Sequence, residues 1–551
     1  MKTIKNIILV ILFGTFVSFC LYIAPNYKKD GTENVTNLVI NYTNVTSKKK
    51  GEVIIEDDGT IYISKQDIEN YYDKYLYYDE QYNYIIAASN GKTACFHIDD
   101  EILDINGNKS NSKIIKKNDT YYIPISKIEE VYNINVKYIE KNNTVVIESL
   151  DRKLQTAKTT KSTNVKYKNT EFSKSLEKLD EGSKVSIVPN EEIINYEGWT
   201  LVKTENGKIG YIKNENLTES IIEREEPVKE NKTISLVWEY FSEYAKAPEN
   251  DENVKYNGVN VVSPSFFYIQ DSKLKENVGT EGVNYINWAK ANNYEVWPMV
   301  ANNSDNKEKM DEFSEWIRDY KKRQNMINQI VNYVKKYNLD GINIDFENIY
   351  LKDKDYLSRF IIELKPKLEA VNAKLSVDVT EPDGSENWSL CFDRNLIGDV
   401  ADYIVFMAYD QHGKSSEVAG STAAYYWVER NINKFINQEE VDPSKIILGI
   451  PFYTILWKQS DNELKGDFVA TKNVDKYITS DLEVQWLEDS KQNYIEYNKN
   501  NVTYKMWIED EQSISEKLNL VNKYNLAGAA FWQKGYEDES IWTIVKQKLM
   551  E

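Results

Sequence analysis

The pattern of apolar residues changes near residue 232. From there to residue 551, eight short runs rich in β-branched apolar residues recur, and amphipathic helical patterns such as residues 326–337 separate most of them. Such runs are typical of buried parallel strands, and eight of them alternating with helices predict an α/β (β/α)8 TIM barrel over residues 232–551. The runs are residues 234–237, 259–262, 296–300, 339–346, 375–379, 403–407, 446–450 and 527–531.

A doubly wound parallel sheet is the competing architecture for this region. It is disfavoured because no glycine-rich phosphate-binding loop follows the first apolar run. The stretch 454–510, between the seventh and eighth runs, is too long for a simple loop and predicts a small α+β insertion.

The N-terminal half has a different texture, which predicts a multidomain chain. Residues 51–150 mix short alternating segments with amphipathic stretches, as expected for an α+β stalk domain. Residues 155–219 carry glycine-marked turns between short strands, a pattern typical of a small all-β barrel. Residues 31–50 are interpreted as a polar tether, and the charged, proline-containing residues 220–231 as a linker.

The first segment, residues 1–30, indicates export. Residues 7–24 are continuously apolar or small and have lysines on both sides. As a helix, such a segment spans about 27 Å, close to the thickness of a bilayer core. We expect a membrane anchor at the surface of a bacterial cell, with a cleaved signal peptide and secretion as the alternative.

Composition narrows the available chemistry. The chain has 68 basic and 87 acidic residues, a net charge of −19, which argues against a nucleic-acid partner because phosphate backbones are repelled. His97 and His412 are the only histidines, so His-cluster metal sites and Ser-His-Asp catalysis are disfavoured. The three cysteines are too scattered for a disulfide framework. We expect no metal and no cofactor, which leaves carboxylates, tyrosine, tryptophan and amides.

The fourth apolar run carries polar residues at alternate positions. Asn343, Asp345 and Glu347 share one face of the predicted strand, and the intervening apolar residues share the other. Two carboxylates inside a barrel are costly unless paired, and burial with mutual repulsion raises the pKa of one of them. This predicts a protonated acid beside an ionised neighbour, an arrangement suited to protonating a leaving group. A structural polar network in the strand is the alternative.

Three segments of this region resemble motifs of family 18 glycoside hydrolases, which include chitinases and spore-peptidoglycan N-acetylglucosaminidases. Residues 340–347, Asp-Gly-Ile-Asn-Ile-Asp-Phe-Glu, resemble the motif D-G-x-x-x-D-x-E. Met407-Ala-Tyr-Asp resembles M-x-Y-D on the sixth strand, and Gly528-Ala-Ala-Phe-Trp resembles the end of the eighth strand. The three segments fall on the appropriate predicted strands in order.

The resemblance implies a retaining, substrate-assisted reaction. Glu347 would act as general acid and then base, Asp345 would hold the N–H of the acetamido group of the substrate, and Tyr409 would bond its carbonyl oxygen. That oxygen attacks the anomeric carbon, so no enzyme nucleophile is needed. Asn343 departs from the aspartate of many chitinases, because its amide can hydrogen-bond Asp345 but cannot share a proton with it. We therefore expect activity with an altered pH profile.

Candidate sugar-binding residues follow from the same resemblance and from the tryptophan distribution. Eleven of the 12 tryptophans lie in the predicted barrel, as suits stacking platforms for sugars. The family's eighth-strand tryptophan, which floors a sugar subsite, corresponds to Trp532. The predicted substrate-binding residues are Trp532, Asp410, Asp340, Trp297 and Trp388.

Two further resemblances concern the N-terminal modules. The segment Thr120-Tyr-Tyr-Ile-Pro-Ile-Ser, with the later Thr144-Val-Val-Ile, resembles the copper amine oxidase N-terminal domain. One histidine in that module cannot build a copper site, so the resemblance implies a spacer. Gly198-Trp-Thr-Leu-Val-Lys-Thr and Gly207-Lys-Ile-Gly-Tyr-Ile resemble a bacterial SH3 domain, which implies either cell-wall binding or another spacer.

The leading hypothesis is a surface-tethered retaining glycosidase that hydrolyses β-linked N-acetylglucosamine-containing glycan, with peptidoglycan as the polysaccharide substrate. Chitin and host N-glycans are alternative substrates. A non-hydrolytic glycan-binding barrel is the alternative from a different class. Glu347 argues against that alternative, because the lectins of the family usually lose the acid.

Overall fold

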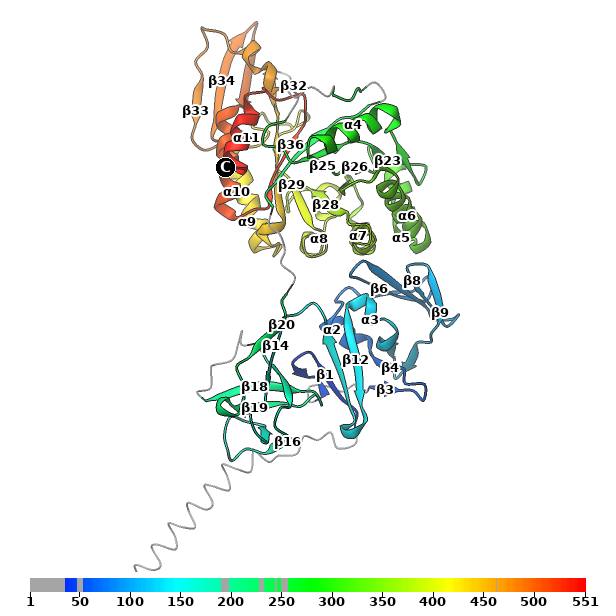
Figure 1. Cartoon of the computed structure of the whole chain (residues 1–551). Coiled ribbons are helices and arrows are strands. Elements are labelled where there is room, and N and C mark those ends of the chain that lie inside the picture. The colour runs from blue at the N-terminus through cyan, green and yellow to red at the C-terminus, as the bar shows by residue number, and fades with distance from the viewer. Residues whose placement is uncertain are drawn as a thin grey trace, which may run out of the picture. The chain divides into compact units, whose positions relative to one another are not determined.

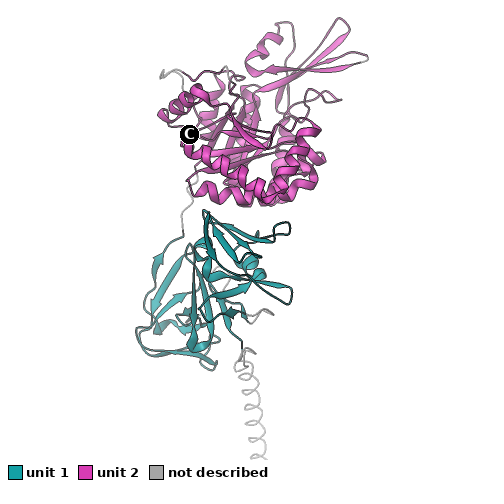
Figure 2. Ribbon diagram, turned by 90° about the vertical axis from the view of Figure 1, so that its right-hand side faces the viewer, with its two compact units in different colours: residues 1–229 teal, residues 230–551 magenta. Residues whose placement is uncertain are grey.

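The computed structural model describes residues 35–46, 53–189, 198–226, 232–242, 245–248, 256–461 and 463–551. The chain divides into two compact units, residues 1–229 and 230–551 (Figure 2). The expected anchor, residues 7–24, lies outside the described residues. Among the helices that the structure describes, none is long and apolar enough to cross a bilayer.

The second unit contains the expected TIM barrel of parallel strands. The first strand pairs with both the second and the last, as closure of a barrel requires. Helices flank the strands along the chain (Figure 1). The strands are β21 (Ile234–Glu239), β22 (Val261–Pro264), β25 (Glu295–Val296) with β26 (Met299–Ala301), β27 (Gly341–Asp345), β28 (Lys374–Val379), β29 (Tyr403–Met407), β30 (Ile446–Pro451) and β36 (Gly528–Trp532).

The third strand of the barrel is interrupted, a detail that its continuous apolar run concealed. β25 pairs with β22, whereas β26 pairs with β27, so the two halves together bridge their neighbours. The interruption contains Pro298, whose ring nitrogen has no N–H to donate to a neighbouring strand. Its carbonyl still accepts a 3.0 Å hydrogen bond from the Asn343 N–H, which keeps the third strand beside the fourth.

Two apolar layers stabilise the barrel. The larger layer lies between the strands and the surrounding helices and includes Ile342 and Ile344 of β27. The smaller layer fills the barrel interior and includes Trp238, Trp297 and Met299. The helices are α4 (Gly279–Ala291), α5 (Lys307–Arg318), α6 (Tyr320–Tyr337), α7 (Lys354–Glu369), α8 (Arg394–Val400), α9 (Tyr425–Asn437), α10 (Glu511–Tyr524) and α11 (Ile541–Leu549), and a hairpin of β23 (Phe267–Gln270) and β24 (Lys273–Glu276) extends the sheet beside β26.

A five-stranded antiparallel sheet lies in sequence between β30 and β36. Among the described residues of the expected insertion, 454–510, the regular helical structure is one 3-10 helix, Thr471–Tyr477, so this segment is richer in strands than the expected α+β insertion. The strands are β31 (Tyr453–Gln459), β32 (Leu464–Ala470), β33 (Gln485–Leu487), β34 (Gln492–Lys499) and β35 (Val502–Ile508).

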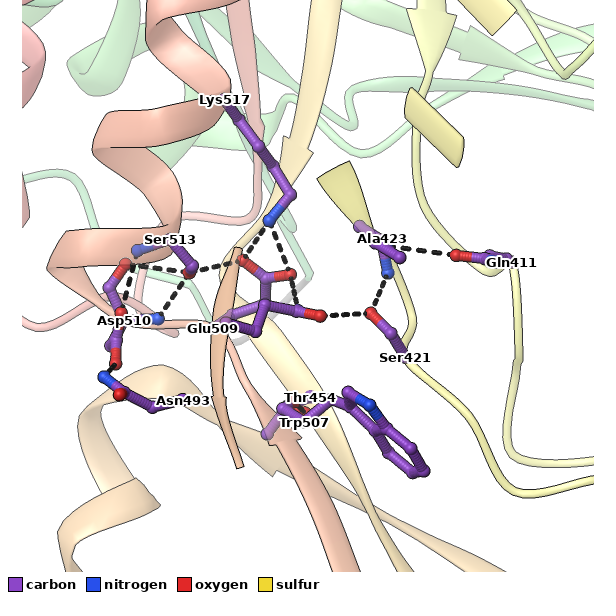
Figure 3. A network of polar contacts seen from close by, with 12 residues as sticks. Gln411, Ser421, Ala423, Thr454, Asn493, Trp507, Glu509, Asp510, Ser513 and Lys517 are labelled. Atoms are coloured by element: carbon purple, nitrogen blue, oxygen red, sulfur yellow. Dashed lines mark hydrogen bonds and ion pairs between the residues drawn. The ribbon is translucent and has the colours of Figure 1, made fainter. Parts of the chain in front are cut away.

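A buried polar network joins this sheet to the barrel (Figure 3). Glu509, which follows β35 and is 0% exposed, accepts hydrogen bonds from Lys517 and Ser513 of α10, each at 2.9 Å. It also accepts a 2.6 Å hydrogen bond from Gln492 of β34, which in turn accepts one from Ser421 at 2.6 Å. Because Ser421 lies between β29 and α9, the network fixes the segment that follows β29. A buried ion pair is tolerated here because its hydrogen bonds are satisfied.

Strands dominate the N-terminal part of the first unit. Two short helices, α2 (Lys65–Tyr71) and α3 (Glu129–Tyr132), pack against them. The strands are β1 (Asn37–Ile40), β2 (Thr43–Asn44), β3 (Ile54–Ile55), β4 (Ile61–Ser64), β5 (Tyr77–Asp79), β6 (Tyr84–Ser89), β7 (Lys92–His97), β8 (Ile102–Ile105), β9 (Asn108–Asn111), β10 (Ile115–Lys117), β11 (Thr120–Pro124), β12 (Ile134–Ile139) and β13 (Thr144–Ser149).

The prediction that residues 31–50 form a tether is wrong for the part that the structure describes. β1 lies within this range and pairs in parallel with β13. Leu38 and Ile40 of β1 are buried in the apolar core of this part of the chain. Three consecutive apolar residues suffice to add a strand to a sheet when the neighbouring strand supplies the hydrogen bonds.

Seven strands from Leu154 to Arg224 form one further sheet, in the region that resembles an SH3 domain. The last of them falls inside the expected linker 220–231 and pairs with the first, so residues 221–224 are sheet rather than linker. The strands are β14 (Leu154–Lys158), β15 (Thr163–Lys166), β16 (Ser175–Leu179), β17 (Lys184–Ile187), β18 (Trp199–Thr204), β19 (Ile209–Lys213) and β20 (Ile221–Arg224).

Candidate active site

A cavity of about 170 Å³ opens where the barrel strands end. In TIM barrels this C-terminal mouth carries the functional groups, because the loops that follow the strands converge there. The cavity collects carboxyl, phenol and indole groups from many parts of the barrel sequence. Its lining residues are Trp238, Met299, Asp345, Glu347, Asp378, Trp388, Met407, Tyr409, Asp410, Tyr453 and Trp532.

Strand alternation on β27 sets the orientation of the predicted catalytic residues. Ile342 and Ile344 pack in the layer beneath the helices, and Asn343 and Asp345 therefore point into the barrel. Asp345 reaches the cavity, whereas Asn343 lies deeper and is 0% exposed. Glu347 lies two residues beyond the end of the strand and also lines the cavity.

Asn302, which the sequence did not single out, fixes the backbone of Glu347. Its Nδ2 donates to the Glu347 carbonyl oxygen at 2.7 Å, and its Oδ1 accepts from the Glu347 N–H at 3.0 Å. Because Asn302 directly follows β26, the segment after β27 is held by the neighbouring strand of the barrel.

Burial and charge separate the proton affinities of the two carboxyls. Burial raises the pKa of Asp345 to about 6, although a hydrogen bond with Glu347 acts in the opposite direction. Burial, and then the negative charges of Asp345 and Asp410, hold the pKa of Glu347 well above its usual range. Glu347 therefore holds a proton more tightly than Asp345 and Asp345 is the better anion, a division that suits acid catalysis.

The sequence suggested that the side-chain amide of Asn343 could hydrogen-bond Asp345, but the amide points to other partners. Its Nδ2 donates to Asp378 Oδ1 at 2.7 Å and to Ser376 Oγ at 3.0 Å, both on β28. Its Oδ1 accepts from Trp238 Nε1 at 2.9 Å. The hydrogen bonds of the amide therefore all go to neighbouring strands, and the expected hydrogen bond from Asn343 to Asp345 is not formed.

Asp378 is a fourth cavity carboxyl, beside Asp345, Glu347 and Asp410, and the sequence reasoning missed it. It is 1% exposed, and burial followed by the charge of Asp345 raises its pKa well above the usual range. A signal was present in the fifth apolar run, where Ser376 and Asp378 alternate with apolar residues as the polar residues of β27 do.

Tyr409, Asp410 and Tyr453 form the wall of the cavity beyond β29 and β30. The hydroxyl of Tyr453 donates to Asp410 Oδ1 at 2.5 Å, and the rings of Tyr453 and Tyr409 meet edge to face at 6.3 Å. Burial raises the pKa of Tyr409, so its phenol stays neutral and can donate a hydrogen bond. Trp532 lies at the end of β36, with its ring 6.0 Å from that of Trp238.

Two predicted substrate-binding residues lie away from the cavity. Asp340 precedes β27, and its Oδ2 accepts a 3.0 Å hydrogen bond from the Val296 N–H. Trp297 is 1% exposed and stacks at 5.6 Å on Tyr403, the first residue of β29. Both residues lie where strands begin, which in a parallel barrel is the end opposite the functional mouth. Their role is structural, whereas Asp410, Trp388 and Trp532 do line the cavity.

Within the described ranges, no group of three or more His, Cys, Asp or Glu side chains is arranged to hold a metal ion. The cavity instead offers carboxyl groups of raised pKa, phenols and indole rings. These groups can protonate a leaving group, stabilise positive charge and stack against a sugar.

Two family models match the chain. Glycosyl hydrolases family 18 matches residues 237–537, which include every cavity-lining residue, and the copper amine oxidase N-terminal domain matches residues 39–147.

Individual proteins are also similar to the chain. The uncharacterized glycosylase YvbX of Bacillus subtilis is 25% identical over 286 residues, which cover 49% of this chain and 79% of YvbX. The cortical fragment-lytic enzyme of Bacillus anthracis is 22% identical over 307 residues, or 52% of this chain and 69% of that protein. In fold, the crystal structure of the spore cortex-lytic enzyme SleL of Bacillus megaterium matches with a TM-score of 0.51 at 20% identity, covering 60% of this chain and 77% of that one.

Proposed function

Because the chain belongs to glycosyl hydrolases family 18 and is a glycoside hydrolase, we propose that it hydrolyses β-linked N-acetylglucosamine-containing glycan. We propose peptidoglycan as the substrate and retention of configuration at the anomeric carbon. The observation that carries the proposal is the hydrogen-bonded pair of Asp345 and Glu347 in a cavity that Tyr409 and Trp532 also line.

Glu347 acts first as the acid. Its raised pKa keeps the proton on the carboxyl until the glycosidic oxygen accepts it as the bond to the leaving sugar breaks. An inverting enzyme needs its two carboxyls roughly 6.5–9.5 Å apart, so that a water molecule fits between the sugar and the base. The hydrogen bond between Asp345 and Glu347 leaves no such space, which supports retention.

The nucleophile is the acetamido oxygen of the substrate, which attacks the anomeric carbon. Asp345 accepts a hydrogen bond from the acetamido N–H and balances the positive charge that develops on this group. Tyr409 donates from its neutral phenol to the acetamido oxygen and aligns it. Water then attacks the anomeric carbon, whose bond to the acetamido oxygen breaks, and gives a proton to the Glu347 carboxylate. The acetamido group and the enzyme thus regain their starting states, and the two displacements retain the configuration.

The choice of peptidoglycan rests on the relatives and on the N-terminal modules. One relative is named as a cortical fragment-lytic enzyme. We propose that the seven-stranded sheet of residues 154–224 is an SH3-like module that binds the cell wall, and that the preceding stalk serves as a spacer. Residues 7–24 anchor the protein in the membrane, which brings the barrel to the wall of its own cell.

Mass spectrometry of muropeptides tests the proposal. Purified full-length protein is incubated with peptidoglycan and, in parallel, with chitin oligosaccharides, and Glu347→Gln serves as the matched control. We expect new reducing N-acetylglucosamine ends from peptidoglycan with the wild type alone. Release of products from chitin only would reassign the substrate, and product sizes would separate exo from endo cleavage. No products from either glycan with the wild type would overturn the proposed activity.

A further inference from the structure

The hydrogen bonds around Asn343 leave one catalytic oxygen without a donor. The Nδ2 of Asn343 donates hydrogen bonds to Asp378 and Ser376, and its Oδ1 accepts a hydrogen bond from Trp238. Oδ1 of Asp345 is buried and has no hydrogen-bond partner among the described residues. A buried carboxylate oxygen without a donor loses the hydrogen bonds it had in water, so a donor beside it would be strongly stabilising.

Asp378 stands at the position from which that donor can come. Asn343 is in register with Ser376 on the adjacent parallel strand, so Asp345 and Asp378 are the next pair of residues that point into the barrel. Both line the same cavity. Oδ1 of Asp378 is already occupied as an acceptor from Asn343, which leaves Oδ2 to carry a proton.

We propose that Asp378 is a positioning residue of this site: it carries a proton on Oδ2 and donates it as a hydrogen bond to Oδ1 of Asp345. The carboxylic acid that Asn343 cannot provide from β27 is thus supplied from β28. This inference rests on the proposed function, because it assigns a part in the same reaction.

The acidic groups that face Asp378 favour its protonated form. Asp345 and Glu347 approach it from β27 and the segment that follows, and Tyr409 from the segment after β29. From β21 the facing side chain is the neutral Trp238, and hydrogen bonds from Trp238 and Asn343 act in the opposite direction and lower the pKa of Asp378. Burial and the charge of Asp345 raise the pKa of Asp378, as a proton held near neutral pH requires. The two aspartates therefore titrate as a pair.

A proton at Asp378 gives Asp345 two fixed tasks. One carboxylate oxygen of Asp345 accepts the hydrogen bond from Asp378. The other oxygen accepts a hydrogen bond from Glu347 before the substrate binds and from the acetamido N–H afterwards. Asp345 then remains an oriented anion when Glu347 loses its proton to the leaving group. If Asp378 instead ionised, two adjacent anions would repel, and Asp345 would lose its orientation.

The pH profile of kcat/KM separates this role from a structural one. Asp378→Asn keeps the shape, accepts from Asn343 and donates permanently to Asp345, but it cannot release a proton. We expect its maximal rate on an aryl N-acetylglucosaminide to stay within about tenfold of wild type, with the alkaline limb moved up by about one pH unit. Ser376→Ala is the control, because it removes the other acceptor of Asn343 without changing any ionisable group. We expect its alkaline limb to lie at the same pH as that of the wild type. An Asp378→Asn profile with the limb at the wild-type pH overturns the proposal.

A second variant covers the case in which Asp378→Asn folds poorly. The exchange Asn343→Asp with Asp378→Asn moves the acid back to β27 and the amide to β28, so an acid remains beside Asp345. We expect the exchange to bring the limb back toward the wild-type pH. An exchange variant whose alkaline limb lies away from the wild-type pH overturns the proposal.

Thermal unfolding provides a test of the proton at Asp378 that does not depend on activity. A carboxyl with a raised pKa in the folded state stabilises it at low pH, and this contribution is lost as the pH rises through the folded pKa. We therefore expect the wild type to lose more Tm between pH 5 and pH 8 than Asp378→Asn. Equal losses overturn the proton at Asp378. If the wild type cleaves no N-acetylglucosaminide, the proposed function fails, and this arm still decides the state of Asp378.

Discussion

Asn302 binds the backbone of Glu347 at two points, through a 2.7 Å hydrogen bond to its carbonyl oxygen and a 3.0 Å hydrogen bond from its N–H. Glu347 lies beyond the last paired residue of β27, so the ladder of that strand does not hold it. The acid is thus oriented by an amide from the neighbouring strand end, and geometry of this kind controls how well a proton reaches a leaving group.

Asn302→Ala should therefore lower kcat more than it changes KM. Both backbone hydrogen bonds are lost, and we expect kcat to fall by about 10- to 100-fold because small displacements of a catalytic group are costly. Steady-state kinetics on an aryl N-acetylglucosaminide would measure this. Asn303→Gly is the matched control in the same loop, because glycine tolerates the positive φ of Asn303. Equal effects of the two variants would refute a specific role for Asn302.

The pKa of Asp345 predicts a pH dependence of stability. Its folded pKa is about 6 against an ordinary value of 3.8, so the stabilisation is complete below about pH 3.8 and is lost as the pH rises through about 6. Asp345→Asn removes this dependence and should narrow the gap in Tm between pH 5 and pH 7. Calorimetry at both pH values would test this.

Asp311 offers a control of opposite sign. Hydrogen bonds from Lys307 and Tyr350 lower its pKa, so its contribution is lost only as the pH falls below the usual carboxyl range. Asp311→Asn should leave the gap between pH 5 and pH 7 as in the wild type. A gap for Asp345→Asn that equals the wild-type gap would contradict the raised pKa.

Asp340 tests the assignment of the two barrel ends. Asp340→Ala leaves the Val296 N–H without its acceptor, and we expect a loss of about 1–3 kcal/mol in the free energy of unfolding. The kcat/KM of the folded protein should stay near that of the wild type, because Asp340 does not line the cavity. Denaturant unfolding and kinetics on one preparation would show both. A large loss of kcat/KM with unchanged stability would return Asp340 to the substrate site.

The sequence predicted the barrel well because parallel strands are buried on both faces and therefore appear as continuous apolar runs. The same property concealed the break at Pro298, since a run of apolar residues does not show which N–H groups are paired. β1 was missed for the converse reason. Three apolar residues in polar sequence form a strand only because β13, about a hundred residues later, pairs with them.

The candidate site was predictable where it depends on alternation within one strand, and not where it depends on neighbouring strands. Alternation placed Asp345 on the inner face. Asp378 and Asn302 act through hydrogen bonds to residues at least 35 positions away in the chain, which no local pattern encodes. Trp297 was misassigned because an aromatic residue at a strand boundary gives no sign of which barrel end it occupies.

The compact unit of residues 230–551 should be catalytically complete. Every residue that lines the cavity belongs to it, so this fragment should hydrolyse a small N-acetylglucosaminide at nearly the full-length rate. Rates on intact cell walls should fall if the first unit targets the enzyme. Parallel assays of both proteins on both substrates would separate the two effects. A large loss on the small glycoside would mean that the first unit contributes to catalysis.

Glu347→Gln tests the mechanism most directly. The amide keeps the shape of the side chain but has no acidic proton, so cleavage of natural glycan, with its poor leaving group, should fall by about 10²–10⁴-fold. An activated aryl glycoside needs less protonation, and the same variant should be partly spared on it. Asp345→Asn should lower the rates of cleavage of the natural glycan and of the aryl glycoside alike, because Asp345 orients the acetamido group rather than protonating the leaving group. A sugar without the N-acetyl group should be inert with the wild type, since it lacks the nucleophile. A wild-type rate for Glu347→Gln on natural glycan would show that the end of β27 is not the active site.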